Sequence, residues 1–344
     1  MNEDGMIQRR CIALYSGGLD SILAIKVMQE QGIEVIPVFF CTPFFGSDAL
    51  KAPETFQRVH ARKYGIHVRV IDYTDDMIQI VSGPRHGFGR HLNPCIDCKI
   101  GMLRRAKQLL ETWNASFVVT GEVTGQRPMS QRRQTMRAIE KESGLEDILL
   151  RPLCARNIEE TLPERLGIVK RDALWDLQGR GRKVQIERAL SYGIAEEDIP
   201  TPAGGCLLTD EQMARKIRKT FERCAPSLPE RADVMLDVVG RKFVFEDSTV
   251  LVVARDEAES NLVSTMGHPG NVFLKTFDVP GPLCIMRGRC TSENLKRAAG
   301  ICLRYGKARG STGHVAVYGE DSCNLDQTVE SPVFSVEYCR TFQD

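Results

Sequence analysis

Residues 16–21 read Ser-Gly-Gly-Leu-Asp-Ser and have the side-chain types that bind a phosphate group. They stand where an apolar, strand-like run ends and a helical pattern begins, and at such a junction free backbone N–H groups and the helix dipole attract an anion. Gly17 and Gly18 let the backbone approach a phosphate closely, while Ser16 and Ser21 add hydroxyl donors. A kinase-type loop also carries a lysine for the transferred γ-phosphate, and this one does not.

The same stretch resembles the S-G-G-x-D-S motif of the PP-loop ATP pyrophosphatases. In that family the loop grips the β- and γ-phosphates as a leaving unit, so attack falls on the α-phosphate and AMP is transferred. The resemblance implies that ATP is bound by Ser16, Gly17, Gly18, Asp20 and Ser21, with Mg²⁺ near Asp20. The alternative is a serine-glycine turn without a ligand, and six matching consecutive positions in this context argue against it.

Three of the 12 cysteines stand in patterns that could do chemistry. Cys95 and Cys98 form a CxxC at the start of a basic helical pattern, and Cys206 follows Gly204 and Gly205, which allow a close backbone approach. A helix N-terminus and nearby cations favour the thiolate, the form that acts as a nucleophile or metal ligand. Structural zinc sites usually show two ligand pairs, whereas this chain has one pair and one single cysteine.

These cysteines resemble those of the tRNA thiouridine synthases, the sulfur-inserting branch of the PP-loop family. Cys95 and Cys98 match its N-P-C-x-x-C, Cys206 matches its later Gly-Cys, and Gly121 matches its Thr-Gly strand end beside the nucleotide. The resemblance implies that a uridine carbonyl oxygen of tRNA attacks the α-phosphate of ATP, pyrophosphate leaves, and sulfur displaces AMP. The implied catalytic residues are Cys95, Cys206 and Asp20.

Two mechanisms fit the three cysteines. In one, Cys95, Cys98 and Cys206 hold a 4Fe–4S cluster through three irons, and the fourth iron takes a hydrosulfide that attacks the adenylated uridine. In the other, Cys206 carries a persulfide and Cys95 helps to release the sulfur. Clusters are bound by thiolates and an open iron can take sulfur, so the cluster is favoured, with free sulfide or an external carrier as the sulfur donor. Structural zinc or inert packing stay open.

The elements that must position these residues alternate between strands and helices. Apolar runs at 11–15, 33–40, 67–73 and 115–121 predict strands, with helical patterns from Ile22, over 53–64 and over 98–113 between them. Such alternation predicts a doubly wound parallel sheet, the α/β class, over 1–153. We expect a connecting module with short helices over 154–226, which carries Cys206, and an α+β domain over 227–344.

A basic stretch lies in the middle of a chain whose formal net charge is only +1. From Lys99 to Arg188 there are 18 Lys and Arg against 12 Asp and Glu, whereas from Glu211 to the end the count is 18 against 18. A local basic excess favours a surface that meets phosphates, with a plain solvated face as the alternative. The residues that we expect to contact RNA phosphates are Arg104, Arg105, Lys107, Arg127, Arg132, Arg133 and the run 179–183.

The C-terminal stretch resembles an NFACT-R-type RNA-binding domain over about 90 residues, through its acidic segment, its Asp-Val-Pro-Gly-Pro turn and a later helix. Where that family has Gly-Arg-Asn, this chain has Ala254, Arg255 and Asp256. The resemblance implies tRNA as the partner of this domain.

The remaining features limit the class of protein. At 344 residues the chain is long enough for two or three domains, and no apolar run approaches the roughly 20 residues of a membrane span. The polar start MNEDGMIQRR predicts that there is no signal peptide and that the protein is cytoplasmic. Two other functions stay open: an ATP-driven ligase of the same fold, which has no need of the three cysteines, and a non-catalytic RNA-binding protein that retains a nucleotide fold.

Overall fold

The computed structural model describes residues 8–343 except 128, 203–204, 278, 308–309 and 320–324, and omits the side chains of 325–326. Gly204, which was expected to allow a close approach before Cys206, lies outside the described residues. The chain divides into two compact units, Met1–Glu211 and Gln212–Asp344. The threefold division at 153 and 226 stays a prediction.

The first unit is built on a sheet of five parallel strands in the order β3-β2-β1-β4-β5. This sheet confirms the α/β class. The strands are β1 (Arg10–Leu14), β2 (Glu34–Cys41), β3 (Arg69–Asp72), β4 (Phe117–Thr120) and β5 (Leu149–Leu150). From β1 the chain builds outward to β3, then returns to place β4 on the other side of β1. The direction of winding therefore reverses between β1 and β4, and the carboxyl ends of these strands flank the crevice where open α/β sheets bind ligands.

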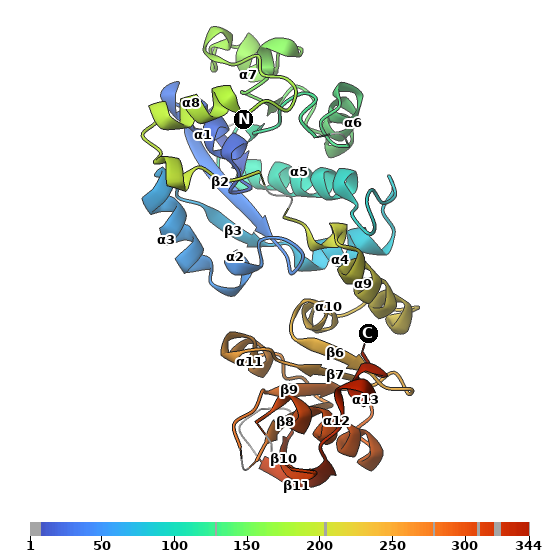
Figure 1. The fold of residues 1–344 in the computed structure, drawn as a ribbon. Coiled ribbons are helices and arrows are strands. Elements are labelled where there is room, and N and C mark those ends of the chain that lie inside the picture. The colour runs from blue at the N-terminus through green and yellow to red at the C-terminus, as the bar shows by residue number, and fades with distance from the viewer. Residues whose placement is uncertain are drawn as a thin grey trace. The chain divides into compact units, whose positions relative to one another are not determined.

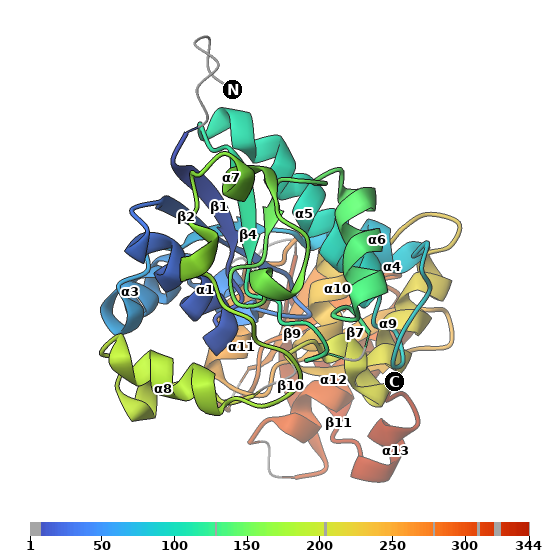
Figure 2. The ribbon, with the colours of Figure 1, turned by 90° about the horizontal axis from the view of Figure 1, so that it is seen from above.

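Helices cover both faces of this sheet (Figures 1 and 2). Alternate residues Cys11 and Ala13 of β1 share a core with α1, α3 and α8, and Leu153 and Val169 belong to the same core. On the opposite face α5 packs on β1 and β4 with α4 and α6 beside it. The helices of this unit are α1 (Leu19–Glu30), α2 (Ser47–Lys51), α3 (Pro53–Tyr64), α4 (Thr74–Ser82), α5 (Cys95–Thr112), α6 (Arg133–Ser143), α7 (Leu162–Arg165) and α8 (Lys183–Ser191), with short turns η1 (Ala155–Asn157), η2 (Arg171–Ala173), η3 (Glu196–Asp198) and η4 (Leu207–Thr209).

The second unit contains an antiparallel sheet of six strands in the order β11-β10-β8-β9-β7-β6. Leu251 faces a core formed with α12, while its neighbour Val252 faces a second core with α10 and α11. The elements are α9 (Glu211–Cys224), α10 (Arg231–Val238), β6 (Arg241–Val244), β7 (Val250–Val253), α11 (Glu257–Ser264), β8 (Asn271–Thr276), β9 (Cys284–Arg287), α12 (Ser292–Tyr305), β10 (Thr312–Tyr318), β11 (Leu325–Pro332) and α13 (Val336–Arg340). The expected α+β class of this region is confirmed.

Among the described residues, no helix is both long enough and apolar enough to span a bilayer.

Candidate nucleotide and thiol site

The loop between β1 and α1 is a tight turn whose hydroxyl groups bond to its own backbone. Ser21 Oγ donates to the carbonyl of Gly18 (2.7 Å) and accepts from the N–H of Ser16 (3.2 Å). Gly17 has a φ of +74°, which disfavours a side chain, and Gly18 caps α1 without a side-chain hydrogen bond. No side chain caps this end of α1, an arrangement that favours an anion, and ATP binding by these loop residues stays a prediction.

Asp20 lies in the first turn of α1 with a buried oxygen. Its Oδ1 has no hydrogen-bond partner among the residues that the structure describes. Burial raises the pKa of Asp20, although Gln126, Arg182, Gln185 and Arg127 around it each act to lower that pKa. An unpaired buried carboxylate oxygen is unfavourable, and a hard cation such as Mg²⁺ prefers oxygen ligands of this kind. By this test Asp20 fits Mg²⁺.

Gly121 follows β4 and packs directly against the phosphate-binding loop. A Cβ added to Gly121 would lie 2.5 Å from the backbone carbonyl of Asp20 and 2.6 Å from the N–H nitrogen of Ser21. No side chain fits at this distance, so glycine is required for β4 and α1 to meet. The sequence predicted Gly121 beside the nucleotide, and the structure assigns it this contact with the loop backbone.

The chain around Cys206 is hydrogen-bonded to the segment that precedes the CxxC. The residue after it, Leu207, donates its N–H to the carbonyl of Phe44 (2.8 Å), and Leu92 donates its N–H to the carbonyl of Leu208 (3.2 Å). Leu92 lies just before α5, whose first residue is Cys95. These two backbone hydrogen bonds fix the chain around Cys206 close to the start of α5.

The three thiols interact with one another. Cys206 and Cys95 both raise the pKa of Cys98, and Cys95 also raises the pKa of Cys206. The structure thus brings together Cys95, Cys98 and Cys206, which the sequence places in two distant stretches. All three are partly exposed, whereas Cys11 is fully buried.

The expected preference for thiolates is wrong for the protein alone. Burial raises the pKa of Cys98 to about 12 and that of Cys206 to about 11. The pKa of Cys95 is also raised by burial, although Asn93, Arg127 and Lys99 act to lower it. Loss of water around the sulfur atoms therefore outweighs the nearby positive charges.

Three soft sulfur donors that repel one another as thiolates are chemically suited to a cationic iron centre, so the donor set fits the predicted cluster. Within the described ranges, however, no three His, Cys, Asp or Glu side chains already stand in a metal-binding arrangement. The roles of Cys95, Cys98 and Cys206 as ligands stay a prediction.

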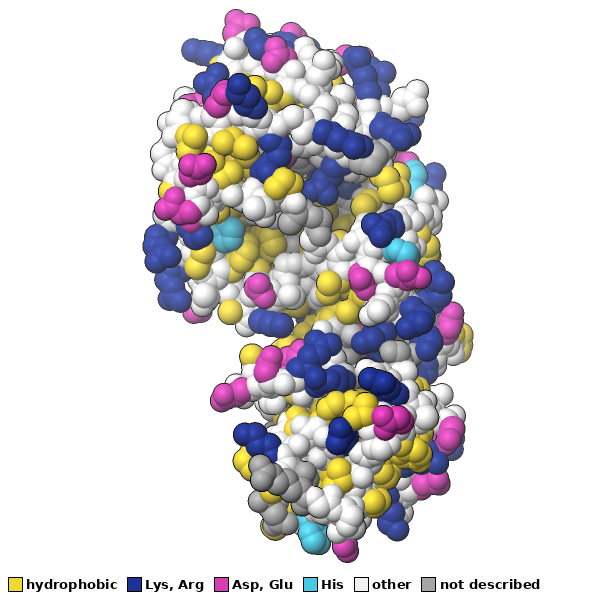
Figure 3. Space-filling model, in the orientation of Figure 1, with side chains coloured by type: hydrophobic (Ala, Val, Ile, Leu, Met, Phe, Trp, Pro, Cys, Tyr) yellow, Lys and Arg dark blue, Asp and Glu magenta, His cyan; other side chains and the backbone are white. Residues whose placement is uncertain are grey.

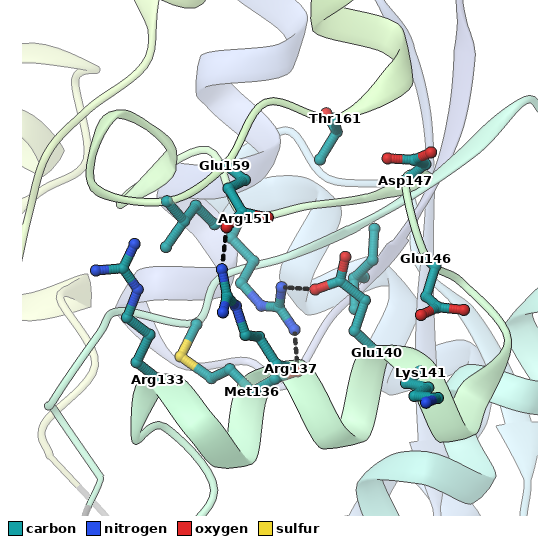
Figure 4. A pocket seen from close by; sticks show the side chains of 12 residues that line it. Arg133, Met136, Arg137, Glu140, Lys141, Glu146, Asp147, Arg151, Glu159 and Thr161 are labelled. Carbon is teal, nitrogen blue, oxygen red and sulfur yellow. Dashed lines mark hydrogen bonds and ion pairs between the residues drawn. The ribbon is translucent and has the colours of Figure 1, made fainter.

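A series of ion pairs connects Lys99 of the CxxC helix to Glu122 and Arg151 in the interior of the unit. Lys99 Nζ lies 3.6 Å from Glu122 Oε1, and Arg151 Nε lies 3.2 Å from Glu122 Oε2. Arg151, only 2% exposed, also bonds to Glu140 (2.8 Å) and to the carbonyl of Met136, as Figure 4 shows. Lys99 and Arg151 lower the pKa of Glu122, which burial would otherwise raise. Glu122 directly follows Gly121, so this network links the cysteine helix to the loop.

Glu122 and Arg151 were not among the site residues predicted from the sequence. Glu122 does stand in the Thr-Gly-Glu that follows β4, so its position next to Gly121 was a usable signal. Arg151 follows β5, which is too short to show any periodicity. Its partnership with Glu122 depends on the pairing of β4 with β5.

Arg127 acts on both parts of the site. This exposed residue, on the loop after β4, lowers the pKa of Asp20 and also that of Cys95. Arg127 is thus close enough to act electrostatically on both the loop carboxylate and the first thiol.

An aromatic cluster flanks the other side of the loop. Tyr15 and His60 share a hydrogen bond between Oη and Nδ1 of 2.6 Å, and Phe56 stacks on His60 with ring centroids 4.1 Å apart. A Cβ on Gly17 would lie 3.6 Å from His60 Cε1. Burial lowers the pKa of His60, so its ring stays neutral over a wider pH range.

Two family models match parts of this chain. Residues 6–163 match the family model described as thiamine biosynthesis protein (ThiI), and residues 240–342 match the NFACT protein RNA binding domain. Over these ranges the first unit is similar to the ThiI family and the second to the NFACT RNA-binding domain, and we call these segments the ThiI-type and NFACT-type domains. The ThiI match includes the loop, Cys95, Cys98 and Gly121, whereas Cys206 lies outside both matched ranges.

Curated relatives of the ThiI-type domain are named as sulfurtransferases. The chain is 28% identical over 154 residues to a "Probable tRNA sulfurtransferase" of Thermococcus kodakarensis, covering 44% of this chain and 39% of the relative. It is 30% identical over 122 residues to one of Methanothermobacter thermautotrophicus, covering 35% and 30%. The chain thus spans well under half of the length of these relatives. A solved "4-thiouridine synthetase - RNA complex with bound ATP" is 21% identical with a TM-score of 0.41, covering 59% of this chain and 45% of that one.

Proposed function

We propose that this protein is a cytoplasmic, ATP-dependent tRNA sulfurtransferase that replaces a carbonyl oxygen of uridine with sulfur. The observation that carries the proposal is the position of Cys206, which the hydrogen bonds of Leu207 and Leu208 hold near Cys95 and Cys98 at the start of α5, in the same unit as the phosphate loop. An ATP-driven ligase has no use for three neighbouring thiols. The names of the curated relatives support the same activity.

The phosphate loop would activate the uridine. The uncapped start of α1 would bind the β- and γ-phosphates, Asp20 would hold Mg²⁺ through its unpaired oxygen, and Arg127 would add positive charge for attack on the α-phosphate. The uridine oxygen bonds to the α-phosphorus and pyrophosphate leaves. This step turns a poor leaving group into AMP. The aromatic cluster around His60 provides ring surface beside the loop for a base.

The three cysteines would provide the sulfur. Cys95, Cys98 and Cys206 would hold a 4Fe–4S cluster, which supplies an iron position that can take sulfide from free sulfide or a carrier. Lys99, fixed by Glu122 at 3.6 Å, keeps a positive charge beside Cys95 and Cys98 and stabilises their thiolate forms. The alternative, in which Cys206 carries a persulfide, uses the same residues and differs in needing no iron.

The NFACT-type domain and the basic residues of the first unit would hold the tRNA. Arg127, Arg132 and Arg133 are exposed and suited to phosphate contacts. Arg104 instead donates two hydrogen bonds to the carbonyl of Glu142, at 3.0 and 2.9 Å, which restrains its side chain.

The test is mass spectrometry of tRNA nucleosides from cells that carry the wild-type gene, no gene, or the Cys206→Ala variant. We expect a thiouridine that needs the gene and is lost in Cys206→Ala, while purified Cys206→Ala still binds ATP. Cys290→Ala, an exposed cysteine of the second unit, is the matched control and should keep the modification. A fully active Cys206→Ala would contradict the proposal. Visible iron-to-sulfur absorbance after anaerobic purification would distinguish the cluster from the persulfide.

A further inference from the structure

Helix α9 is positively charged, although the C-terminal region that contains it has no net charge. Glu211–Cys224 contains five Lys or Arg and two Glu, a net charge of +3, although the stretch from Glu211 to the end is neutral. The helix lies outside both ranges matched by family models, 6–163 and 240–342. Neither match therefore assigns it a role.

The charge lies on one side of the helix. Ala214, Ile217 and Thr220 are buried, whereas Arg215, Arg218 and Lys219 are exposed. Spacings of three and four residues place these three cations within about one helical turn of each other on the same face. Figure 3 shows Lys and Arg side chains gathered over the surface of α9. We call Arg215, Arg218 and Lys219 the α9 basic face.

The two arginines of the α9 basic face are available to a ligand. Within the part of the chain that the structure describes, Arg215 and Arg218 take part in no ion pair or hydrogen bond, whereas Arg287 in the same unit is paired with Asp233 at 3.0 Å. Glu211 and Glu222 stand four residues from Arg215 and Arg218, but neither forms a described ion pair with them. Both guanidinium groups can therefore bind an anionic partner.

A buried polar cluster fixes the rotation of α9 in the second unit. Thr220 Oγ1 donates to Asp237 Oδ1 (3.0 Å) and accepts from Lys242 Nζ (2.7 Å), and Lys242 is ion-paired with Asp237. Lys242 and Asp237 are at most 1% exposed. Because breaking a buried pair is costly, the cluster holds Thr220 inward and the opposite face outward. The α9 basic face is therefore presented by a fixed scaffold.

We propose that the α9 basic face binds the phosphate backbone of RNA and extends the binding surface of the NFACT-type domain. Arginine matches phosphate geometry with paired hydrogen bonds, and contacts of this kind position an RNA without reading its sequence. That the RNA is tRNA rests on the proposed function. A small acidic ligand would need a concave site, whereas a convex helix face suits an extended polyanion.

The experiment measures tRNA binding by the full chain with fluorescence anisotropy over a range of salt concentrations. The variant Arg215→Gln/Arg218→Gln/Lys219→Gln should bind roughly 10-fold or more weakly near 0.1 M salt, and its salt slope should fall by about 2. Lys51→Gln/Arg58→Gln/Arg62→Gln removes the same charge from an exposed part of the first unit and is the matched control. Arg215→Lys/Arg218→Lys keeps the charge and should retain most of the salt slope.

The outcomes separate this inference from the proposed function. Wild-type protein that binds no tRNA would contradict the proposed function, and the inference with it. Wild-type binding that the α9 triple variant leaves unchanged would overturn the inference alone. An equal loss in the control variant would also overturn it, because the effect would then follow net charge. Loss of binding to anionic vesicles, with tRNA binding unchanged, would assign the face to membranes and reject the proposal.

Discussion

Both units bury a charged pair, but the two pairs are connected differently. In the first unit Arg151 and Glu122 are 2% and 3% exposed, and they connect outward to Lys99 and Glu140. In the second unit Lys242 and Asp237 bond to each other and to Thr220 of α9. The first pair is linked to Lys99, the residue after the CxxC. The second pair is linked to α9 through Thr220.

We infer from this difference that the two buried ion pairs have different roles. A buried ion pair adds little to stability compared with apolar packing, so its retention is explained better by what it positions. The Arg151–Glu122 pair keeps a carboxylate ionised beside Lys99 and next to Gly121. The Lys242–Asp237 pair keeps α9 in one rotation. Substitutions in each pair should therefore have different functional consequences.

The largest effect is expected at Arg151. Arg151→Met removes the cation that is hydrogen-bonded to the buried Glu122 and leaves Lys99 at 3.6 Å, so we expect the free energy of unfolding of the first unit to fall by about 3–5 kcal/mol. Chemical denaturation followed by hydrogen exchange of β1 and β4 measures this loss. Arg151→Met/Glu122→Gln removes both charges and should recover part of it.

The control for Arg151 is an exposed pair in the same unit. Arg156 and Asp176 are 2.7 Å apart, with side chains 45% and 58% exposed. Arg156→Met should cost less than about 1 kcal/mol. Equal losses in Arg151→Met and Arg156→Met would show that burial does not distinguish the two pairs.

Lys242→Met tests the second pair. Asp237 would remain buried without a cation, so a loss of about 3–5 kcal/mol is again expected, confined to the second unit. Hydrogen exchange in β7 and β9 should rise, while ATP binding by the first unit should be unchanged. A loss of ATP binding in Lys242→Met would contradict the proposed division of roles.

The sequence predicted the elements that its periodicity and motifs mark strongly. The strands of residues 11–15 and 33–40 appear as β1 and β2, because both are continuous apolar runs buried between helices. Residues 74–82 were assigned to no strand or helix but form α4, a single short amphipathic stretch that is followed by a Gly- and His-rich segment. The CxxC helix starts at Cys95 rather than at 98.

Contacts between residues that are far apart in the sequence could be predicted less well. The return of Cys206 was expected from the family resemblance alone, and in the structure it depends on hydrogen bonds to Phe44 and Leu92 that no spacing encodes. The partners of Glu122 lie on α5 and after β5, so only the strand order brings them together. The sequence did not predict the α9 basic face, because the C-terminal region as a whole has equal numbers of basic and acidic residues.

Alkylation sharpens the comparison of thiols in the two units. In protein free of metal, a pKa of about 11 for Cys206 and about 12 for Cys98 leaves little thiolate at pH 8. The raised pKa means that reactivity is absent at low pH and returns only as pH rises towards these values. We expect Cys206 to react with iodoacetamide about 100-fold more slowly than a free thiol at pH 8, with a rate that rises about tenfold per pH unit.

The second unit supplies the contrast for this measurement. Cys284 of β9 and Cys302 of α12 are 0% exposed within one core, so their alkylation requires unfolding. Their rate should follow denaturant rather than the thiolate fraction. Mass spectrometry of peptides sampled between pH 7 and 9 separates the two behaviours. Fast modification of Cys206 at pH 7 would show that its thiolate is stabilised, contrary to the effect of burial.

The smallest effect is expected from adding one methyl group at Gly121. In Gly121→Ala the new Cβ would overlap the backbone of Asp20 at 2.5 Å, so β4 and the start of α1 must separate. We expect ATP affinity, measured by calorimetry, to fall about tenfold, which corresponds to about 1.4 kcal/mol. Gly83→Ala is the control, because a Cβ there meets nothing within 4 Å. Since Glu122 follows Gly121, the same displacement should weaken its contact with Lys99 without removing the buried charge pair. Unchanged ATP affinity in Gly121→Ala would mean that the junction of β4 with α1 tolerates movement, and that the phosphate loop does not depend on the network that the first unit buries.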